Sequence, residues 1–418
     1  MGKHAVTQTL AAAAAEAVDD EALLAWARGE GVTFHGITVA ATEVGGRGCV
    51  AVRALQAGAL VLRVPGRLLL TCSSARRDAR LASSGLRPAA LLAAHLLHEA
   101  AKGRAALFFA YVRSLPRHYN DGGCFSDEEG RALQRPHAVA AVAQLREERR
   151  ADWHAARAVL LELGVPPKLC SYAAWSWAAS AVCSRTVYFP EEPPGAGALC
   201  VCGDAFNHDT RLSVDGGTSC GSGCYDASSD TYDFYAQCDV EAGAQCFVSY
   251  GAHPNLTLLL HYGFILPRNT LDVALLPRSP HLEALAVDDA DLFVACADGA
   301  PSWRLLAALR LHAATPALRR KHGHTAAAGE MLDWASESAA YARLRRACAG
   351  ALAELPSTAD EDELELSRLA AGTRMHLAVT WRLQQKRALE LGVRAAEKRL
   401  QESSAAQRNL AACVLVRP

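Results

Sequence analysis

The stretch that decides the fold contains Asp204-Ala-Phe-Asn207-His208, then Gln245-Cys-Phe-Val248-Ser-Tyr250-Gly251, then Asn255, and finally His261-Tyr262-Gly263-Phe264. Short apolar runs alternate here with glycines and aspartates, a pattern typical of short strands joined by tight turns. An Asn-His dipeptide or a strand tyrosine is ordinary when it is met alone. The order of these pieces along the chain therefore carries more information than any one of them.

The hydrophobic pattern changes period several times along the chain. Residues 32–70 contain short apolar runs punctuated by glycines, and Ala57-Gly58 predicts a turn between two strands. Residues 88–182 show helical spacing, and short strands return over 186–276. From about 280 onward the pattern is helical to the end. The expected fold class is therefore α+β, in the order strands, helical insertion, strands and helical tail.

Composition narrows the possible partners. The 418 residues are enough for two or three packed units, and 51% hydrophobic with 21% charged residues is typical of a folded globular protein. The formal net charge of −1 indicates no general attraction to nucleic-acid phosphates. No apolar run reaches membrane-spanning length. We expect neither a nucleic-acid nor a membrane partner.

The 14 cysteines are scattered among apolar residues, and no secretory signal is visible at the N-terminus. Reduced intracellular thiols are the simpler interpretation. Asp19, Asp20 and Glu21 argue against an organelle transit peptide, because such peptides are poor in acids. We expect a cytoplasmic or nuclear protein, with a plastid location the weaker alternative.

Two further motifs precede the decisive stretch, namely Gly45-Gly46-Arg47-Gly48 and Ser184-Arg185. In this order the motifs resemble the SET-domain protein methyltransferases, and most closely the branch of the Rubisco large-subunit lysine methyltransferase and the actin-histidine methyltransferase. The resemblance is specific over about residues 31–267. It implies a β-rich SET core of short strands with a pseudoknot, a helical insertion, and an all-α C-terminal substrate-binding domain.

The resemblance also implies where each segment of the fold begins and ends. The expected segments are an N-terminal helix within 1–30, the first SET half over 31–90, the helical insertion over 91–182, the second SET half over 183–276, and a Rubisco-methyltransferase-type helical domain over 277–418. The Ala-rich pattern places the first helix at residues 8–29. Residues 356–364 form an acidic connection that predicts an N-cap for the next helix.

The family transfers a methyl group from S-adenosylmethionine to a side-chain nitrogen of a protein. The resemblance implies that the C-terminal helical domain binds this protein substrate. It also implies that Arg185 pairs with the carboxylate of the cofactor. The full set of cofactor-binding residues implied in this way is Gly45, Gly46, Arg47, Arg185, Asp204, Asn207, His208 and Tyr250.

Methyl transfer to nitrogen is an in-line displacement, so positioning and the exclusion of water supply most of the rate. A lysine amine must also be neutral, and an apolar channel that desolvates it lowers its pKa. The resemblance implies that Tyr250 at the channel throat and Tyr262 beside it form the catalytic pair. Ser184, Val187, Val248 and Tyr262 are implied to line the channel. The chemistry requires no metal.

The acceptor is the point where this chain departs from its family. Lysine-modifying members carry an aromatic residue at the position of Val187, and the actin-histidine enzyme carries Asn. His253-Pro254-Asn255 keeps only the Asn of a family Ser-Asn pair. Transfer to a lysine of a non-histone protein is the leading hypothesis. Transfer to histidine, a catalytically silent SET protein that binds a partner, and a chance match on a generic α+β scaffold are the alternatives.

Four cysteines near the core have a second interpretation. A tetrahedral zinc site needs four ligands, and four thiols are available here, those of Cys200, Cys202, Cys220 and Cys224. The zinc cluster of some SET proteins follows the core and has a spacing that is absent here, so buried or loop thiols are the preferred interpretation. The Gly/Ser-rich surroundings of Cys220 and Cys224 predict an exposed loop.

Overall fold

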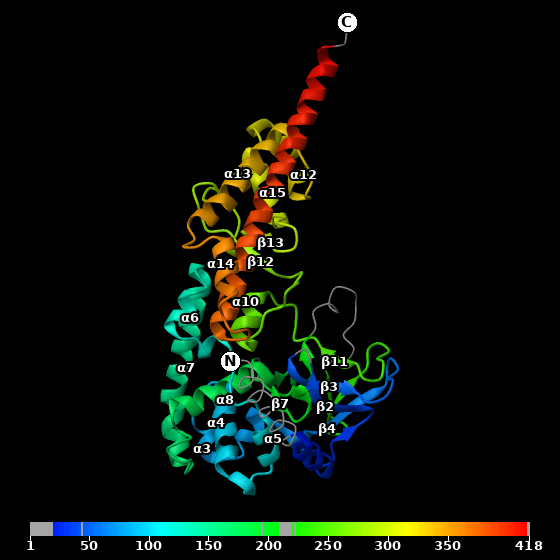
Figure 1. Cartoon of the computed structure of the whole chain (residues 1–418), viewed down its shortest axis with the longest axis vertical. Coiled ribbons are helices and arrows are strands. Elements are labelled where there is room, and N and C mark those ends of the chain that lie inside the picture. Colours follow the sequence, from blue (N-terminus) through cyan, green and yellow to red (C-terminus); the bar gives the residue numbers. More distant parts are fainter. Residues whose placement is uncertain (1–19, 43–44, 194, 209–219, 221–222, 416–418) are drawn as a thin grey trace. The chain divides into compact units, whose positions relative to one another are not determined.

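The computed structural model describes residues 20–42, 45–193, 195–208, 220 and 223–415 (Figure 1). The chain forms two compact units, each assembled from separate stretches of sequence. The core unit is drawn from Met1–Cys124, Ala143–Ala252 and Leu260–Gly263. The C-terminal unit is drawn from Phe125–Val142, His253–Leu259 and Phe264–Pro418.

The strands of the core unit form three small sheets, and each sheet joins strands from both halves of the predicted SET core. The first has the order β2 (Ile37–Thr42), β3 (Gly46–Ala51), β11 (Gln245–Val248) and β8 (Asn207–His208). The second has the order β1 (Thr33–Phe34), β4 (Leu60–Pro65), β10 (Thr231–Tyr235) and β9 (Cys224–Asp226). The third has the order β5 (Leu69–Leu70), β7 (Ala198–Cys200) and β6 (Thr186–Val187).

Helices complete the core unit. They are a helix over residues 20–29, α2 (Cys72–Ala75), α3 (Ala79–Ala82), α4 (Pro88–Ala101), α5 (Phe109–Ser114), α8 (Tyr172–Arg185) and most of α7 (Pro136–Glu162). Helix α4 begins at a proline, whose missing N–H costs nothing at a helix start. Its leucines are buried in the core, where α4 packs against α8. Within the described part of the chain, no helix is both long and apolar enough to cross a bilayer.

The expected order of strands and helices is confirmed. The turn at Ala57-Gly58 is present, and Gly58 adopts a φ of +83°, a left-handed conformation that favours glycine. The predicted helix over 8–29 is described only from residue 20, where it is helical as expected. Its earlier part lies outside the described residues.

The C-terminal unit is built around two long helices that pack along each other, α13 (Trp334–Ala353) and α15 (Arg374–Leu415) (Figure 1). Its other helices are α6 (Asp127–Arg131), α10 (Asn255–Thr257), α11 (Trp303–Ala313), α12 (Pro316–Ala327) and α14 (Ala359–Leu366). The helical domain is therefore present as predicted, but it is not all-α. Strands β12 (Val273–Leu275) and β13 (Phe293–Ala295) form an antiparallel pair, which is too short to show as a period in the sequence.

The predicted N-cap in the acidic connection is present at Thr358. Its hydroxyl accepts a hydrogen bond from the Glu361 N–H at 3.2 Å, and the Glu361 carboxylate accepts one from the Thr358 N–H at 2.7 Å. This reciprocal arrangement is a capping box, and it satisfies two main-chain donors at the start of α14.

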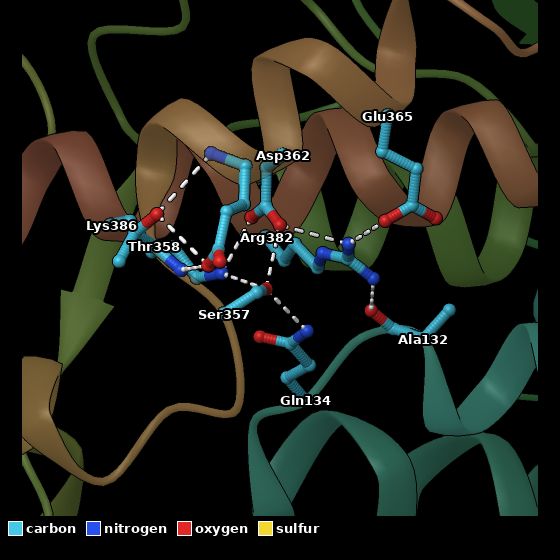
Figure 2. A network of polar contacts seen from close by, with 9 residues as sticks. Ala132, Gln134, Ser357, Thr358, Asp362, Glu365, Arg382 and Lys386 are labelled. Atoms are coloured by element: carbon cyan, nitrogen blue, oxygen red, sulfur yellow. Dashed lines mark hydrogen bonds and ion pairs between the residues drawn. The ribbon is translucent and has the colours of Figure 1, made fainter.

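A buried polar network joins α14 and α15 inside the C-terminal unit (Figure 2). The Asp362 carboxylate accepts hydrogen bonds from Lys386 at 2.6 Å and from Arg382 at 2.8 Å. Ser357 donates to Asp362 at 2.7 Å and accepts from Gln134 at 2.8 Å. Through Gln134, the network holds part of the predicted helical insertion within the C-terminal unit.

Candidate active site

Strand pairing brings the key motifs together although they lie far apart in sequence. In the parallel pair of β8 and β11, Asn207 lies opposite Phe247 and His208 lies opposite Val248. On its other side β11 pairs with β3, which begins within the glycine motif at Gly46. The Asn-His, Val-Ser-Tyr and glycine motifs therefore meet in one sheet.

The glycine turn packs directly against Asn207. Gly45 and Gly46 have φ values of +81° and +73°. A Cβ added at Gly45 would lie 2.6 Å from the Asn207 amide nitrogen, and one at Gly48 would lie 2.8 Å from it. Asn207 in turn donates to the Arg47 carbonyl at 2.8 Å. Only glycine allows this close approach of main chain to the amide.

The Arg47 side chain binds the protein itself. Its guanidinium lies 3.1 Å from the Asp20 carboxylate and donates to the Ser114 carbonyl. Cofactor contacts at Arg47 are expected through its main chain, and this arrangement of the side chain is compatible with that expectation. Asp20, on the helix over residues 20–29, is a partner that no motif indicated.

Arg185 and Asp204 form a buried ion pair. The Arg185 guanidinium donates to the Asp204 carboxylate and to its carbonyl, each at 3.1 Å, and the Asp204 side chain is only 1% exposed. Tyr111 donates to the same carboxylate at 2.9 Å. Burial opposes the charged form of Arg185, but Asp204 and the neighbouring tyrosines together outweigh this effect, so the pKa of Arg185 is raised. The Arg185 Nε is buried and has no hydrogen-bond partner within the described residues.

Tyr250 is fixed at three points. Its hydroxyl donates to the Phe206 carbonyl at 2.7 Å, and its N–H donates to His208 Nδ1 at 3.0 Å. Its ring stacks on the His208 ring with centroids 5.1 Å apart. Burial raises the pKa of the Tyr250 hydroxyl; the Arg185 charge opposes this effect and the Asp204 charge adds to it. The hydroxyl therefore keeps its proton at neutral pH.

The two predicted catalytic tyrosines lie against each other. The rings of Tyr250 and Tyr262 stack with centroids 4.9 Å apart and an interplanar angle of 28°. Tyr262 ends a π-helical turn, η5 (Leu258–Tyr262), a rare conformation that is frequent at functional sites. Burial also raises the pKa of Tyr262.

The residues predicted to line the acceptor channel lie on neighbouring elements. Val187 is half-buried on β6, and Val248 is buried on β11 two residues before Tyr250. Ser184 is half-buried near the end of α8, where its hydroxyl donates to the Ser180 carbonyl at 2.7 Å. This bond directs the Ser184 hydroxyl to the main chain of its own helix.

Some residues near the predicted site belong to none of the sequence motifs. Tyr111 and Tyr119 come from the helical insertion, and burial raises the pKa of Tyr119 to about 12 although Arg185 opposes the shift. Cys183 lies 3.5 Å from the His261 ring nitrogen. The only signal for His261 was its place beside Tyr262, and none pointed to Tyr111, Tyr119 or Cys183.

The expectation of an exposed loop is wrong for Cys220. Its side chain is buried because its N–H donates to the Phe247 carbonyl and it bridges to Ala236. Cys200 and Cys202 are also buried, whereas Cys224 is exposed as expected. Over the described residues, no group of three or more His, Cys, Asp or Glu side chains has the geometry to hold a metal ion.

The three sheets, the stacked tyrosines and the joined motifs define a SET domain. The chain belongs to the SET-domain protein methyltransferases, in the branch of the Rubisco large-subunit lysine methyltransferase. S-adenosylmethionine is the methyl donor of this family. The protein "SET DOMAIN GROUP 40" of Arabidopsis thaliana is 30% identical to this chain over 78% of it and 72% of the relative.

Other comparisons agree. Residues 278–389 match the family model described as Rubisco LSMT substrate-binding. The actin-histidine N-methyltransferase of Mus musculus is 26% identical, over 90% of this chain and 68% of the relative. The crystal structure of the SET domain of LSMT bound to lysine and AdoHcy is similar in fold, with a TM-score of 0.67, 20% identity and 92% of each chain covered.

Proposed function

We propose that this protein is an S-adenosylmethionine-dependent methyltransferase that modifies a lysine of a non-histone protein. The observation that carries the proposal is the stacked pair of Tyr250 and Tyr262. Tyr250 is also hydrogen-bonded to His208 of the Asn-His motif. Family membership supports methyl transfer, and the tyrosine pair supports an acceptor nitrogen bound between aromatic hydroxyls.

The residues around Asn207 and Arg185 fit the cofactor. No atom lies within 4 Å of a Cβ built at Gly46, so the main chain of the glycine motif is open there, and the Arg185 Nε is a buried donor without a partner in the described residues. A carboxylate is the natural partner of such a donor. S-adenosylmethionine, when bound, supplies the methyl group. Arg185, Asn207 and the glycine-turn main chain would hold it.

The chain's own residues prepare the acceptor. Tyr250 and Tyr262 keep their hydroxyl protons at neutral pH, because burial raises the pKa of both. The neutral hydroxyl oxygens can accept hydrogen bonds from the N–H groups of a neutral amine, which orients it and leaves its lone pair free. Val187 and Val248 provide apolar surface that disfavours the ammonium form and so leaves a lone pair for attack.

We infer that the C-terminal unit holds the protein substrate. An open groove of about 390 Å³ lies beside Trp303, whose side chain is 64% exposed. The Arg304 guanidinium lies over the Trp303 ring, 5.2 Å from its centroid, and pairs with Asp291 at 2.7 Å. An exposed tryptophan beside a groove is typical of a protein-binding surface. The groove lies within the residues that match the substrate-binding family model.

Histidine is the second candidate acceptor, because actin-histidine N-methyltransferases are among the relatives that align with nine-tenths of this chain. Val187 supports neither acceptor specifically, since it is neither the aromatic residue of the lysine enzymes nor the Asn of the histidine enzyme.

The test is to label an unfractionated protein extract with methyl-tritiated S-adenosylmethionine and to identify the modified side chain by mass spectrometry. Methyl-lysine supports the leading proposal, and methyl-histidine supports the second candidate. Cofactor binding without any transfer, in extracts of several sources, would favour a silent partner-binding protein. The Tyr250→Phe variant is the control for transfer that does not depend on the site.

A further inference from the structure

The position of Tyr262 depends on an unusual backbone conformation. It is the last residue of the π-helical turn, and Gly263 after it has a φ of +76°. A π turn is less favourable than a regular helix, so surrounding contacts must hold it. Helix α8 and the segment 120–122 supply these contacts within the core unit.

The first contact is between α8 and the residue before Tyr262. Cys183 Sγ lies 3.5 Å from His261 Nδ1. Burial raises the pKa of Cys183 to about 11, so the thiol is protonated at neutral pH and can donate to the ring nitrogen.

The second contact comes from the segment 120–122. A Cβ added at Gly263 would lie 2.8 Å from the Asn120 carbonyl carbon. A Cβ added at Gly122 would lie 2.7 Å from a methyl group of Leu260. Leu260 and Gly263, on either side of Tyr262, thus pack so closely against this segment that no additional carbon would fit.

A buried ion pair anchors the segment. The Arg149 guanidinium on α7 donates to the Asp121 carboxylate at 2.6 Å, and the two side chains are only 9% and 2% exposed. Arg149 also donates to Ser180 and Ser176 on α8, at 3.0 and 3.1 Å. The pair therefore fixes the segment to the same helix that carries Cys183.

We propose that Cys183, His261, Asp121 and Arg149 are positioning residues that hold Tyr262 against Tyr250 and so set the rate of methyl transfer. This inference rests on the proposed function. None of the four side chains needs to touch the substrate, because they act through the π turn. A small displacement of a group in the site is enough to slow transfer greatly.

The kinetic test compares Cys183→Ala, Cys183→Ser and Asp121→Asn in the labelling of protein extract. We expect kcat to fall about tenfold in Cys183→Ala and Asp121→Asn, with the KM for S-adenosylmethionine within about twofold. Cys183→Ser retains a donor for His261 and should recover most of the loss. Equal losses in both Cys183 variants, or an unchanged kcat in Asp121→Asn, would overturn the proposal.

Matched controls come from the same unit. Asp233 is an equally buried carboxylate paired with Arg63, and Cys170 is a buried thiol that donates to the Val165 carbonyl. Asp233→Asn and Cys170→Ala should leave kcat unchanged. A loss in these controls as large as in the test variants would mean that reduced stability explains the effect, and the proposal would fail.

A second readout does not require transfer. With ¹³Cζ-tyrosine labelling, the Tyr262 NMR signal is assigned by its absence in Tyr262→Phe. Its chemical shift should move in Cys183→Ala and Asp121→Asn and stay in place in both controls. A signal that does not move would overturn the positioning role even in an active enzyme. If the native chain is inactive but the Tyr262 signal moves as expected, the proposed function fails and the positioning role stands.

Discussion

The main-chain N–H of Tyr250 donates to Nδ1 of His208 at 3.0 Å, and the two rings stack within 18° of parallel. The side chain of His208 thereby connects the Asn-His motif to one tyrosine of the predicted catalytic pair. His208 is predicted to bind the cofactor, and Tyr250 is predicted to contact both the cofactor and the acceptor. A change at His208 should therefore disturb both.

Replacing His208 tests this coupling. In His208→Ala the Tyr250 N–H loses its acceptor, and we expect the free energy of unfolding to fall by about 1–3 kcal/mol. Calorimetry should also show weaker binding of S-adenosylmethionine. His208→Asn offers another side-chain acceptor and is the matched control. Unchanged stability and binding in His208→Ala would show that the contact contributes nothing.

The hydroxyl groups of the tyrosine pair should matter for turnover more than for cofactor binding. Tyr250→Phe and Tyr262→Phe each remove one hydroxyl while keeping the stacked ring. We expect kcat to fall by about 100-fold, because a preorganised hydrogen-bonding hydroxyl is lost, with cofactor affinity changed only a few-fold. Stopped labelling assays and calorimetry measure the two quantities. Full activity in both variants would remove these residues from the catalytic account.

The network of Figure 2 gives a stability prediction. Asp362→Asn leaves Lys386 and Arg382 buried without their shared counter-charge, and we expect a loss of about 3–5 kcal/mol in the free energy of unfolding. Glu365→Gln is the control, since its side chain is 44% exposed and the same Arg382 pairs with it. That change should cost less than about 1 kcal/mol in denaturant titrations. Similar costs for both variants would contradict a dominant role for burial.

His95 should make the protein less stable in mild acid. Burial lowers its pKa to about 4, below the ordinary 6.5, although Glu99 opposes the shift. The unfolded chain therefore binds more protons between these values, so the contribution of His95 is complete above pH 6.5 and is lost as pH falls toward 4. We expect up to about 3 kcal/mol from this residue. Denaturation of His95→Gln should show a smaller fall in stability between pH 7 and 5, and an identical fall would refute the assignment.

Trp303 should affect substrate affinity alone. Trp303→Ala removes exposed aromatic surface beside the groove, and we expect the KM for the protein substrate to rise about tenfold with kcat unchanged. Leu364→Ala, which removes another exposed apolar side chain of the same unit, is the control. Labelling rates at graded substrate concentrations separate the two constants. A fall in kcat without a change in KM would place Trp303 outside substrate binding.

Local patterns and motif order predicted much of this molecule. The cap at Thr358 and the turn at Gly58 depend on neighbouring residues, and both are present. Asp121 and Cys183 were not predicted, because their roles depend on tertiary contacts with residues far along the chain. Cys220 was mispredicted since its flanking glycines and serines indicated exposure, whereas strand-like pairing buries it.

The central claim is that Arg185, Asn207 and the glycine turn form a site for S-adenosylmethionine. Calorimetry of the native chain beside Arg185→Ala and Asn207→Ala tests it most directly, with circular dichroism to confirm folding. The account predicts one bound cofactor per native chain and at least tenfold weaker binding in each folded variant. Absence of binding to the native chain, with or without protein extract present, or equal affinity in all three proteins would contradict it.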